Sequence, residues 1–431
     1  MRILVDMTET ALHGYHTGIQ RVVRNVILRL PGLSAGLGTE LLPVVALGAR
    51  LYQVLEPLAA TAVRPAPAPG TPAAGGGSRT PFRQTLRQAL ERLPGAPLLL
   101  RPWRRHRLYQ SLRSLELALL TPRQDDLYLL LDSFWGRSTV VEAFTAFHRR
   151  GGRTVAVFYD LIPLTHPQFC GERVVADFRR DSPKVLGQAD AVLAISATVA
   201  QQVGAYAAQA VPGWNQRPRP VEHFYLGADF AAGAGADGTG QGWSGWPSGL
   251  WGAGPVFLML GTLEPRKGHA LVLEAFERRW QAGSQEVLLF VGRLDGEMLQ
   301  VRERMARAAQ LKRPFCHLAT VPDLALAEAI RRSRAGIVAS CVEGFGLPLV
   351  EFMQQGLPVL ASDIPVFREV GAGYPVYFPL TGPEGLGAAL DEFYRREAEI
   401  RRQLTGFRWL SWDEAAETLL RRVLALGARA R

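Results

Sequence analysis

The feature that most constrains the fold of this chain is a regular alternation of short apolar runs with amphipathic helical patterns. Residues 2–8, RILVDMT, are typical of a strand, and a loop containing Gly14 and Gly18 follows them. Beyond this loop, apolar residues recur at the i, i+3, i+4, i+7 spacing of a helix: Ile19, Val22, Val23, Val26, Ile27 and Leu30. A strand, a glycine-containing turn and a helix open a βαβ unit, so the sequence predicts an α/β fold.

The alternation occurs in two series, which indicates two domains. The first series continues with the runs DLYLLLDS, RTVAVFYD, DAVLAIS and PVEHFYLG, and the second extends from VFLMLGT to PVLAS. Between them, residues 231–254 are dense in glycine and nearly uncharged, as in a linker. We therefore expect a first domain at 1–230, a linker at 231–254, a second domain at 255–408 and a last helix within 409–431. Each domain would hold a mostly parallel sheet covered on both sides.

Most of the positive charge lies in one insert near residues 79–118. The chain has a net charge of +10, and the stretch from Arg79 to Arg113 contributes +8 of it through nine Arg and one Glu. Outside this stretch, positive and negative residues are nearly equal in number, which argues against a nucleic-acid partner. Apolar residues at helical spacing between the arginines, with Trp103 nearby, suit an anionic membrane surface. A solvated basic face explains the same pattern, and both interpretations stay open.

Cysteine usage and the N-terminus favour a reduced, cytoplasmic location. The three cysteines, Cys170, Cys316 and Cys341, lack CxxC or metal-ligand spacing. The opening MRILVDMTET lacks the features of a secretory signal, and the apolar runs stop far short of the ~20 residues of a membrane-spanning helix. We expect a cytoplasmic protein, with peripheral attachment to the inner face of the plasma membrane as an open alternative.

The stretch AGIVASCVEGFGLPLVEFMQQGLPVLASD, residues 335–363, reads as a complete βαβ unit with a glycine-containing loop. Ligands bind at the carboxyl ends of strands in open parallel sheets, and here that position holds Glu343, Gly344, Phe345 and Gly346. The following helix would point its positive dipole at the same place, so the loop suits an anion. Taken alone, Glu343 is typical of a solvated loop acid, and Glu351 of an acid that stabilises the helix start.

A second loop with the same placement is GTLEPRKGH, residues 261–269. It contains Gly261, Arg266 and Lys267 between a strand and a helix. Two cations next to a helix start suit the binding of a diphosphate. An Arg-Lys pair is, however, also common on protein surfaces that bind no ligand.

These segments, in this order, resemble the large retaining glycosyltransferase family 4, particularly its bacterial mannosyl- and rhamnosyltransferases. EGFGLPLVE reproduces the family's pair of glutamates separated by seven residues, and ASDIPVFREVG is similar to the segment that follows. GTLEPRKGH resembles the phosphate-binding loop, and TGIQRVVRNV the N-terminal glycine loop. FYDLIPLTHP, ADAVLAIS and SWDEAAETLL are also similar to family segments. The resemblance implies the GT-B fold: two Rossmann-like, doubly wound parallel-sheet domains facing across a cleft, with the last helix crossing back to the first domain.

The resemblance also implies residue roles. Glu351 would bind the ribose of a nucleotide and Glu343 the hydroxyls of the donor sugar, while Arg266 and Lys267 neutralise the diphosphate. Backbone groups at the helix start would hold sugar and phosphate, and the remaining donor-binding positions would be Gly261, Gly344, Phe345, Gly346, Leu347 and, from the other domain, Gly18 and Arg21. Many relatives carry His where this chain has Tyr159. Asp160, which follows it, is a candidate for contacting the sugar or orienting the acceptor, or for capping the next turn.

The predicted activity is retaining transfer of a hexose from a nucleotide-diphosphate sugar to a polysaccharide or a lipid-linked oligosaccharide. A GDP-linked, mannose-type donor is favoured. We expect no metal or other cofactor, because the sequence has no Asp-x-Asp pair and the two cations with the helix dipole can stabilise the leaving diphosphate. Two alternatives remain: another GT-B enzyme, such as a sugar-nucleotide epimerase or a glycogen- or starch-type synthase, and a catalytically silent scaffold that binds nucleotide sugars.

Overall fold

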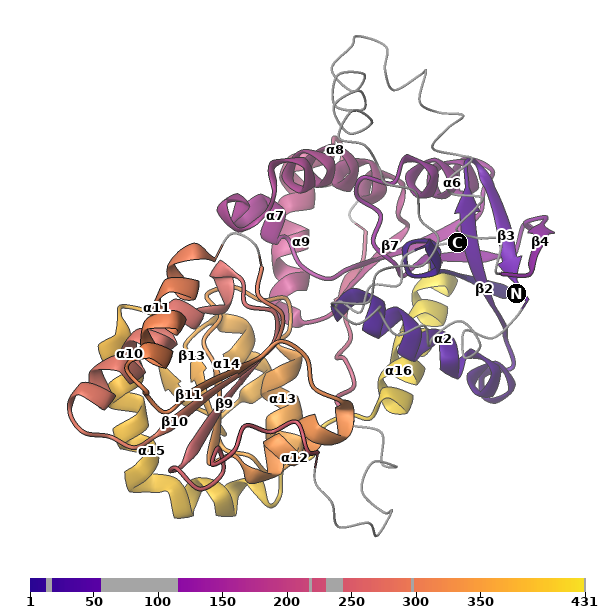
Figure 1. Cartoon of the computed structure of the whole chain (residues 1–431). Coiled ribbons are helices and arrows are strands. Elements are labelled where there is room, and N and C mark those ends of the chain that lie inside the picture. The colour runs from indigo at the N-terminus through magenta and orange to yellow at the C-terminus, as the bar shows by residue number, and fades with distance from the viewer. Residues whose placement is uncertain (13–17, 56–114, 217–218, 230–242, 296–297, 430–431) are drawn as a thin grey trace, which may run out of the picture. The chain divides into compact units, whose positions relative to one another are not determined.

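The structure, a computed structural model, describes residues 1–12, 18–55, 115–216, 219–229, 243–295 and 298–429 (Figure 1). Gly14, the predicted basic stretch 79–113 and residues 231–242 of the predicted linker lie outside these ranges. The chain divides into two compact units, residues 1–154 and 155–431, with the division inside one strand. The predicted domain bounds stay predictions.

Unit 1 is built on a sheet with the strand order β4-β3-β2-β1-β5. β1 pairs in parallel with β2 and with β5, whereas β2, β3 and β4 are antiparallel neighbours. The strands are β1 (Arg2–Asp6), β2 (Glu40–Leu47), β3 (Arg50–Val54), β4 (Leu117–Leu120) and β5 (Leu127–Leu130). The helices are α1 (Thr8–Leu12), α2 (Gly18–Leu37) and α6 (Ser138–Arg149).

The helix predicted after the first strand is confirmed as α2. Its predicted apolar face is buried from Val22 to Leu30, and only Ile19 at its start is half-buried. The sequence pattern missed β2, β3 and β4. A tight turn with Gly48 at φ +66° joins β2 to β3 and lets the chain reverse, so these strands need no helix between them.

Unit 2 begins with three parallel strands in the order β6-β7-β8. The strands are β6 (Arg153–Phe158), β7 (Ala191–Ala194) and β8 (Val221–His223). The helices that accompany them are α7 (Ile162–Thr165), the 3-10 helix η2 (Pro167–Phe169), α8 (Glu172–Gln188) and α9 (Ala197–Ala210).

Unit 2 also contains a six-stranded, entirely parallel sheet with the order β11-β10-β9-β12-β13-β14. Its strands are β9 (Val256–Leu260), β10 (Val287–Val291), β11 (Phe315–Leu318), β12 (Ala335–Val338), β13 (Val359–Ser362) and β14 (Val376–Phe378). The helices are η3 (Pro265–Lys267), α10 (His269–Gln281), α11 (Leu299–Gln310), α12 (Asp323–Arg332), α13 (Leu347–Gln354), α14 (Pro365–Gly371), α15 (Pro383–Leu404) and α16 (Trp412–Arg429). Every residue of β10, β12 and β13 is buried, as in a sheet with helices on both faces (Figure 1). The predicted α/β class with two parallel sheets is therefore confirmed.

The described end of the predicted linker packs against α12. Trp243, Trp246 and Trp251 meet edge to face, with ring centroids 4.9 and 5.1 Å apart. Trp246 Nε1 donates to Glu328 Oε2 at 3.0 Å, and the Arg332 guanidinium lies 4.5 Å from the Trp251 ring centroid. Residues 243–254 thus carry a tryptophan cluster that the glycine count of the linker did not predict.

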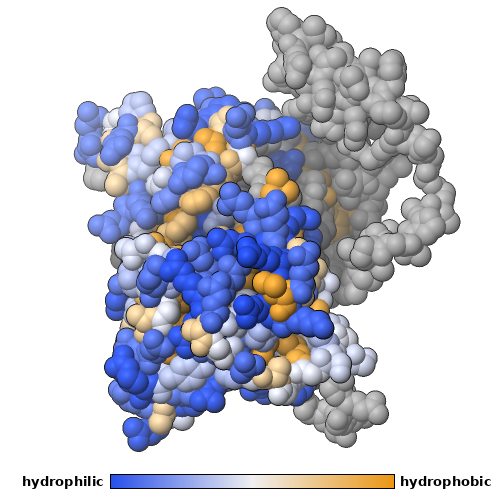
Figure 2. Space-filling view, turned by 60° about the vertical axis from the view of Figure 1, so that its left-hand side comes forward, coloured by the Kyte–Doolittle hydropathy of each residue, from blue (hydrophilic) through white to orange (hydrophobic). Residues whose placement is uncertain are grey.

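The visible surface is mainly hydrophilic. On the face in Figure 2, hydrophobic residues form small patches between hydrophilic ones. No helix in the described ranges is long and apolar enough to cross a bilayer.

Candidate functional site

The candidate site lies where the strand order of the six-stranded sheet reverses. From β9 the chain proceeds outward through β10 to β11, and then returns to β12 beside β9 before proceeding to β13 and β14. Open parallel sheets bind ligands at the carboxyl ends of the two strands at such a point. Those ends carry the two loops singled out in the sequence, 261–268 after β9 and 339–346 after β12.

The two loops touch through their backbones. Cys341 N–H donates to the carbonyl of Arg266 at 2.8 Å. Gly268 adopts φ +77°, and a Cβ there would lie 2.3 Å from the carbonyl oxygen of Ala339. Glycine is therefore required at position 268 both for its backbone conformation and for the close approach of the two loops.

Glu343 is the centre of a charged cluster formed by both loops. Its Oε2 lies 2.9 Å from Arg266 Nη1, and its Oε1 is paired with Lys267 Nζ. Ser340 Oγ donates to Glu343 Oε1 at 2.9 Å. The structure thus brings three predicted site residues, Glu343, Arg266 and Lys267, into direct contact.

The cations keep this buried acid ionised. Burial by itself raises the pKa of Glu343, but Lys267 and Arg266 outweigh it and hold the pKa at about 2. Burial likewise lowers the pKa of Arg266, while Glu343 and Glu264 raise it above its ordinary value. Glu343 and Arg266 are therefore both charged at neutral pH, and this ion pair can exchange partners without a proton transfer.

A second carboxylate holds Arg266 from the other side. Glu264 Oε1 lies 2.6 Å from Arg266 Nη2, and the side chains of Glu264 and Arg266 are 25% and 20% exposed. The guanidinium therefore bridges Glu264 and Glu343.

Asp160, at the end of β6, accepts the N–H of Ile162 at 2.9 Å and so caps the turn into α7. Burial raises its pKa, and the bond from Ile162 and the charge of Arg266 oppose that rise. Asp160 is therefore close enough to the cluster to affect Arg266, and its predicted role toward sugar or acceptor stays open.

Gly344 packs against the end of β6. A Cβ on Gly344 would lie 2.0 Å from the carbonyl oxygen of Tyr159 and 3.3 Å from Asp160 Cβ. Ser196 Oγ, beyond the end of β7, donates to the Gly344 carbonyl at 2.8 Å. The loop that carries Glu343 is thus fixed from two neighbouring strand ends.

The other predicted residues of this loop lie at the start of α13. The Phe345 side chain is buried between Tyr225 and Trp409, with centroids 6.2 and 5.9 Å away, which leaves its backbone for any ligand contact. Gly346 precedes α13 with φ +94°, and a Cβ there would meet the Phe367 ring at 2.4 Å. Leu347 is the first residue of α13.

Glu351, in the same helix, has a 2% exposed side chain. Gly261 follows β9 with φ +129°, and its N–H donates to Val291 at 2.9 Å. The predicted ribose contact of Glu351 and the donor contact of Gly261 stay predictions.

Gly18 and Arg21 belong to unit 1. Gly18 is the first residue of α2 and is exposed, and Arg21 is half-buried one turn later. Their predicted contact with the donor stays a prediction.

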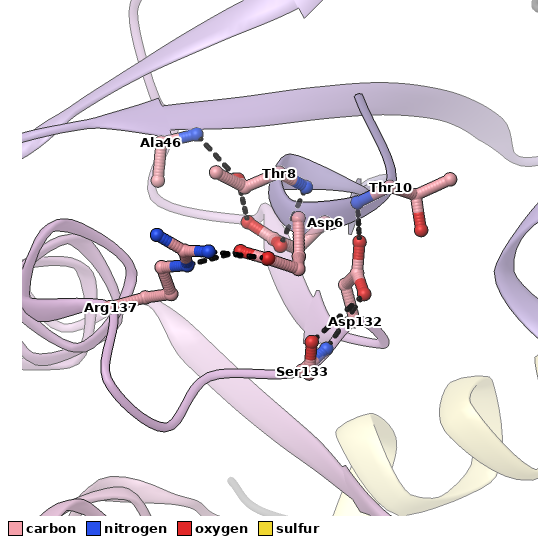
Figure 3. A network of polar contacts seen from close by, with 8 residues as sticks. Asp6, Thr8, Thr10, Ala46, Asp132, Ser133 and Arg137 are labelled. Atoms are coloured by element: carbon pink, nitrogen blue, oxygen red, sulfur yellow. Dashed lines mark hydrogen bonds and ion pairs between the residues drawn. The ribbon is translucent and has the colours of Figure 1, made fainter. Parts of the chain in front are cut away.

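A polar network occupies the corresponding edge of the unit 1 sheet, at the ends of β1 and β5 (Figure 3). Asp6 accepts hydrogen bonds from Thr8 N–H, Thr8 Oγ1 and Tyr128 Oη at 3.1, 3.0 and 2.6 Å. Asp132 accepts from Thr10 N–H at 2.6 Å and Ser133 N–H at 2.8 Å. Burial raises the pKa of Asp6 to about 6, and burial together with the charge of Asp6 raises that of Asp132 to about 7.

Sequence reasoning missed several residues of this arrangement. Glu264 stood in the quoted GTLEPRKGH loop, and its place two residues before Arg266 was the available signal. Ser340 and Ser196 carried no signal, because a serine after a strand is common and its partner is distant in the chain. Among the described residues, no three His, Cys, Asp or Glu side chains gather as around a metal ion.

Sequence comparisons find one matching family model and several mannosyltransferases. Residues 248–404 match the family model described as "Glycosyl transferases group 1". The serotype-specific mannosyltransferase WbdA of Escherichia coli is 34% identical over 286 residues, which cover 65% of this chain and 35% of WbdA. The phosphatidyl-myo-inositol mannosyltransferase of Mycobacterium leprae is 31% identical over 176 residues, 39% of this chain and 46% of that protein. The chain therefore spans about a third of the length of WbdA.

A structural comparison extends over the whole chain. The crystal structure of Anabaena HepE in complex with UDP and glucose matches with a TM-score of 0.53 and 14% identity, covering 100% of this chain and 98% of HepE. At this identity the likeness establishes the fold, and the predicted GT-B class is confirmed.

Proposed function

We propose that the protein is a glycosyltransferase that uses a nucleotide-diphosphate sugar, because residues 248–404 match the family model of glycosyl transferases group 1. The observation that carries the proposal is the contact of Arg266 and Lys267 with Glu343 at the ends of β9 and β12. Breaking the anomeric bond places negative charge on the leaving diphosphate and positive charge on the sugar ring. Fixed cations and a fixed carboxylate stabilise these two charges respectively.

The proposed donor site divides the work among the loop residues. Arg266 and Lys267 bind the diphosphate, helped by the backbone at the start of α13, and Glu351 binds the ribose. Glu343 faces the donor sugar, as a nucleophile or as an electrostatic partner. Transfer proceeds with retention and without a metal ion, since the two cations supply the charge that a metal would otherwise provide.

A mannose-type sugar with a GDP leaving group is the proposed donor, and a polysaccharide or lipid-linked oligosaccharide is the proposed acceptor. The printed names of WbdA and of the mycobacterial relative support mannosyl transfer. We place the reaction on the cytoplasmic side, with the basic insert 79–118 as a candidate contact to an anionic membrane.

A thermal-shift panel with GDP, UDP, dTDP and ADP, each with and without its sugar, tests the donor site. A nucleotide at about 100 times its dissociation constant stabilises the protein by roughly 2.7 kcal/mol. We expect GDP and GDP-mannose to raise the Tm of the wild type and not that of Arg266→Ala. The absence of a shift with every nucleotide would remove the basis of the proposal.

Product analysis then separates the reaction types. A labelled donor with a glycan acceptor should give an elongated glycan whose new linkage has the donor's anomeric configuration, and chelators should leave the rate unchanged. A labelled sugar nucleotide with altered stereochemistry would instead identify an epimerase. Nucleotide binding without any product, for a range of acceptors, would favour a scaffold.

A further inference from the structure

Glu264 is a carboxylate of the donor site for which the proposed transfer chemistry has no use. Its Oε1 lies 2.6 Å from Arg266 Nη2, whereas Glu343 contacts Nη1 of the same guanidinium. Its backbone is fixed, because Lys267 N–H donates to the Glu264 carbonyl at 3.0 Å as η3 begins. An acid that is held beside the main phosphate-binding cation must lower the affinity of that cation for another anion.

The two cations and the two glutamates of the cluster balance each other in charge before any phosphate is considered. Arg266 and Lys267 face Glu343 and Glu264, and Asp160 adds a further negative charge that acts on Arg266. A diphosphate can therefore pair with both cations only in exchange for Glu343. Glu264 pairs with a different nitrogen of Arg266, so this exchange does not require Glu264 to leave.

The two ligands of a transferase differ in charge. The terminal phosphate of a nucleoside diphosphate ionises a second time near pH 6, so at neutral pH it carries roughly one more negative charge than the same phosphate esterified to a sugar. A fixed carboxylate next to Arg266 repels the product more strongly than the donor.

We propose that Glu264 is a specificity-determining residue that weakens binding of the released nucleoside diphosphate relative to the intact sugar nucleotide. This inference rests on the proposed function of the site. Glu264 touches Arg266 and acts through it, so it is not a catalytic residue. By limiting product affinity it favours product release, a step that often limits turnover.

Titration calorimetry of Glu264→Gln with GDP and GDP-mannose tests the proposal. We expect the variant to bind GDP about tenfold more tightly at pH 7.5, equal to about 1.4 kcal/mol, and GDP-mannose with a clearly smaller gain. At pH 5.5 the GDP gain should shrink, because the terminal phosphate loses its second charge. A purely structural role of Glu264 would produce neither the ligand difference nor the pH difference.

Glu277→Gln is the matched control. Glu277 lies 2.6 Å from Arg304 with a 24% exposed side chain, so the substitution removes a similar ion pair elsewhere in unit 2. It should leave both affinities unchanged.

The outcomes separate this inference from the function on which it rests. Weaker or unchanged GDP binding by Glu264→Gln, with binding by the wild type intact, overturns the inference alone and assigns Glu264 to the orientation of Arg266. Equal gains for GDP and GDP-mannose also overturn it, because charge discrimination is then absent. If the wild type binds no nucleotide, both the inference and the proposed donor site fail.

Discussion

The carboxylate of Glu343 remains ionised in a buried position because Arg266, Lys267 and Ser340 all direct donors at it. Moving an isolated carboxylate out of water is costly, and close cations with hydrogen bonds offset that cost. With a folded pKa of about 2, the stabilisation from these pairs is present above the ordinary pKa of a glutamate and is lost only as the pH falls through about 2. The Glu343 carboxylate therefore keeps its charge over the whole physiological range.

Asp132 in unit 1 has the opposite dependence on pH. Its pKa of about 7 in the folded state lies above the 3.8 of an ordinary aspartate, so the folded protein holds the proton more tightly than the unfolded chain. Its contribution to the free energy of unfolding is full below pH ~4 and is lost as the pH rises through about 7. Each tenfold difference in proton affinity corresponds to about 1.4 kcal/mol.

We predict that Asp132→Asn flattens the decline in the free energy of unfolding between pH 4.5 and 7.5. Denaturant titrations at several pH values measure the slope. The exposed Asp323 gives the control, since Asp323→Asn should keep the wild-type slope. An unchanged slope in Asp132→Asn would show that the network does not hold the proton.

Single residues also mark the limit of what the sequence could predict. Glu343, Arg266 and Lys267 were predicted from loop position and resemblance, because strand order alone brings the ends of β9 and β12 together. Glu264 was missed because its place two residues before Arg266 does not by itself show that the two side chains form an ion pair. Only the structure shows that Arg266 has a carboxylate on each side.

At the scale of elements, the loop between β12 and α13 depends on having no side chain at position 344. The Tyr159 carbonyl oxygen lies 2.0 Å from where a Cβ would stand, and backbone cannot move aside as a flexible side chain can. We predict that Gly344→Ala displaces this loop and lowers transfer by roughly 100-fold or more, a loss typical of misplaced reacting groups.

Activity with a labelled donor and the Tm measure this effect. Gly204→Ala, within α9 and with open space around it, is the control and should be neutral or slightly stabilising. Wild-type transfer by Gly344→Ala would contradict the close contact with β6.

In the six-stranded sheet, β9, β10, β12 and β13 could be predicted because buried parallel strands are short apolar runs, and α10, α12 and α13 because their helical patterns carry an apolar stripe. The edge strands β11 and β14 were missed, because β11 is only half-buried and β14 is three residues long. The edge strands of the unit 1 sheet could not be predicted from the sequence either. β3 and β4 pair antiparallel across the interval from Val54 to Leu117, and no local pattern joins strands so far apart. The aromatic packing of Phe345 was equally hidden, because its partners Tyr225 and Trp409 are distant in the chain.

At the scale of the molecule, the segment before α16 connects the two sheet regions of unit 2. Trp409 Nε1 donates to the Leu226 carbonyl at 2.8 Å, and Ala228 N–H donates to the Leu410 carbonyl at 3.0 Å. The Trp409 ring packs against Tyr225 and Phe345. Residues just after β8 and just before α16 are thus held side by side.

We predict that Trp409→Ala lowers the free energy of unfolding by roughly 2–3 kcal/mol, somewhat below the ~3–5 kcal/mol of a fully buried tryptophan, because the ring is half-buried. Trp409→Phe keeps the ring packing and should lose only about 1 kcal/mol, for the hydrogen bond. Denaturant unfolding measures both. If both variants lost the same free energy of unfolding, the hydrogen bond of Trp409 and not its ring packing would stabilise this contact.

The same ring contact has a mechanical consequence. Trp409 leans on Phe345, and Phe345 follows Glu343 and Gly344 in the chain. The segment before the last helix is therefore linked through two aromatic rings to the loop that carries Glu343, the acid proposed to face the donor sugar. A displacement of α16 would in this way reach the proposed donor site through side chains alone.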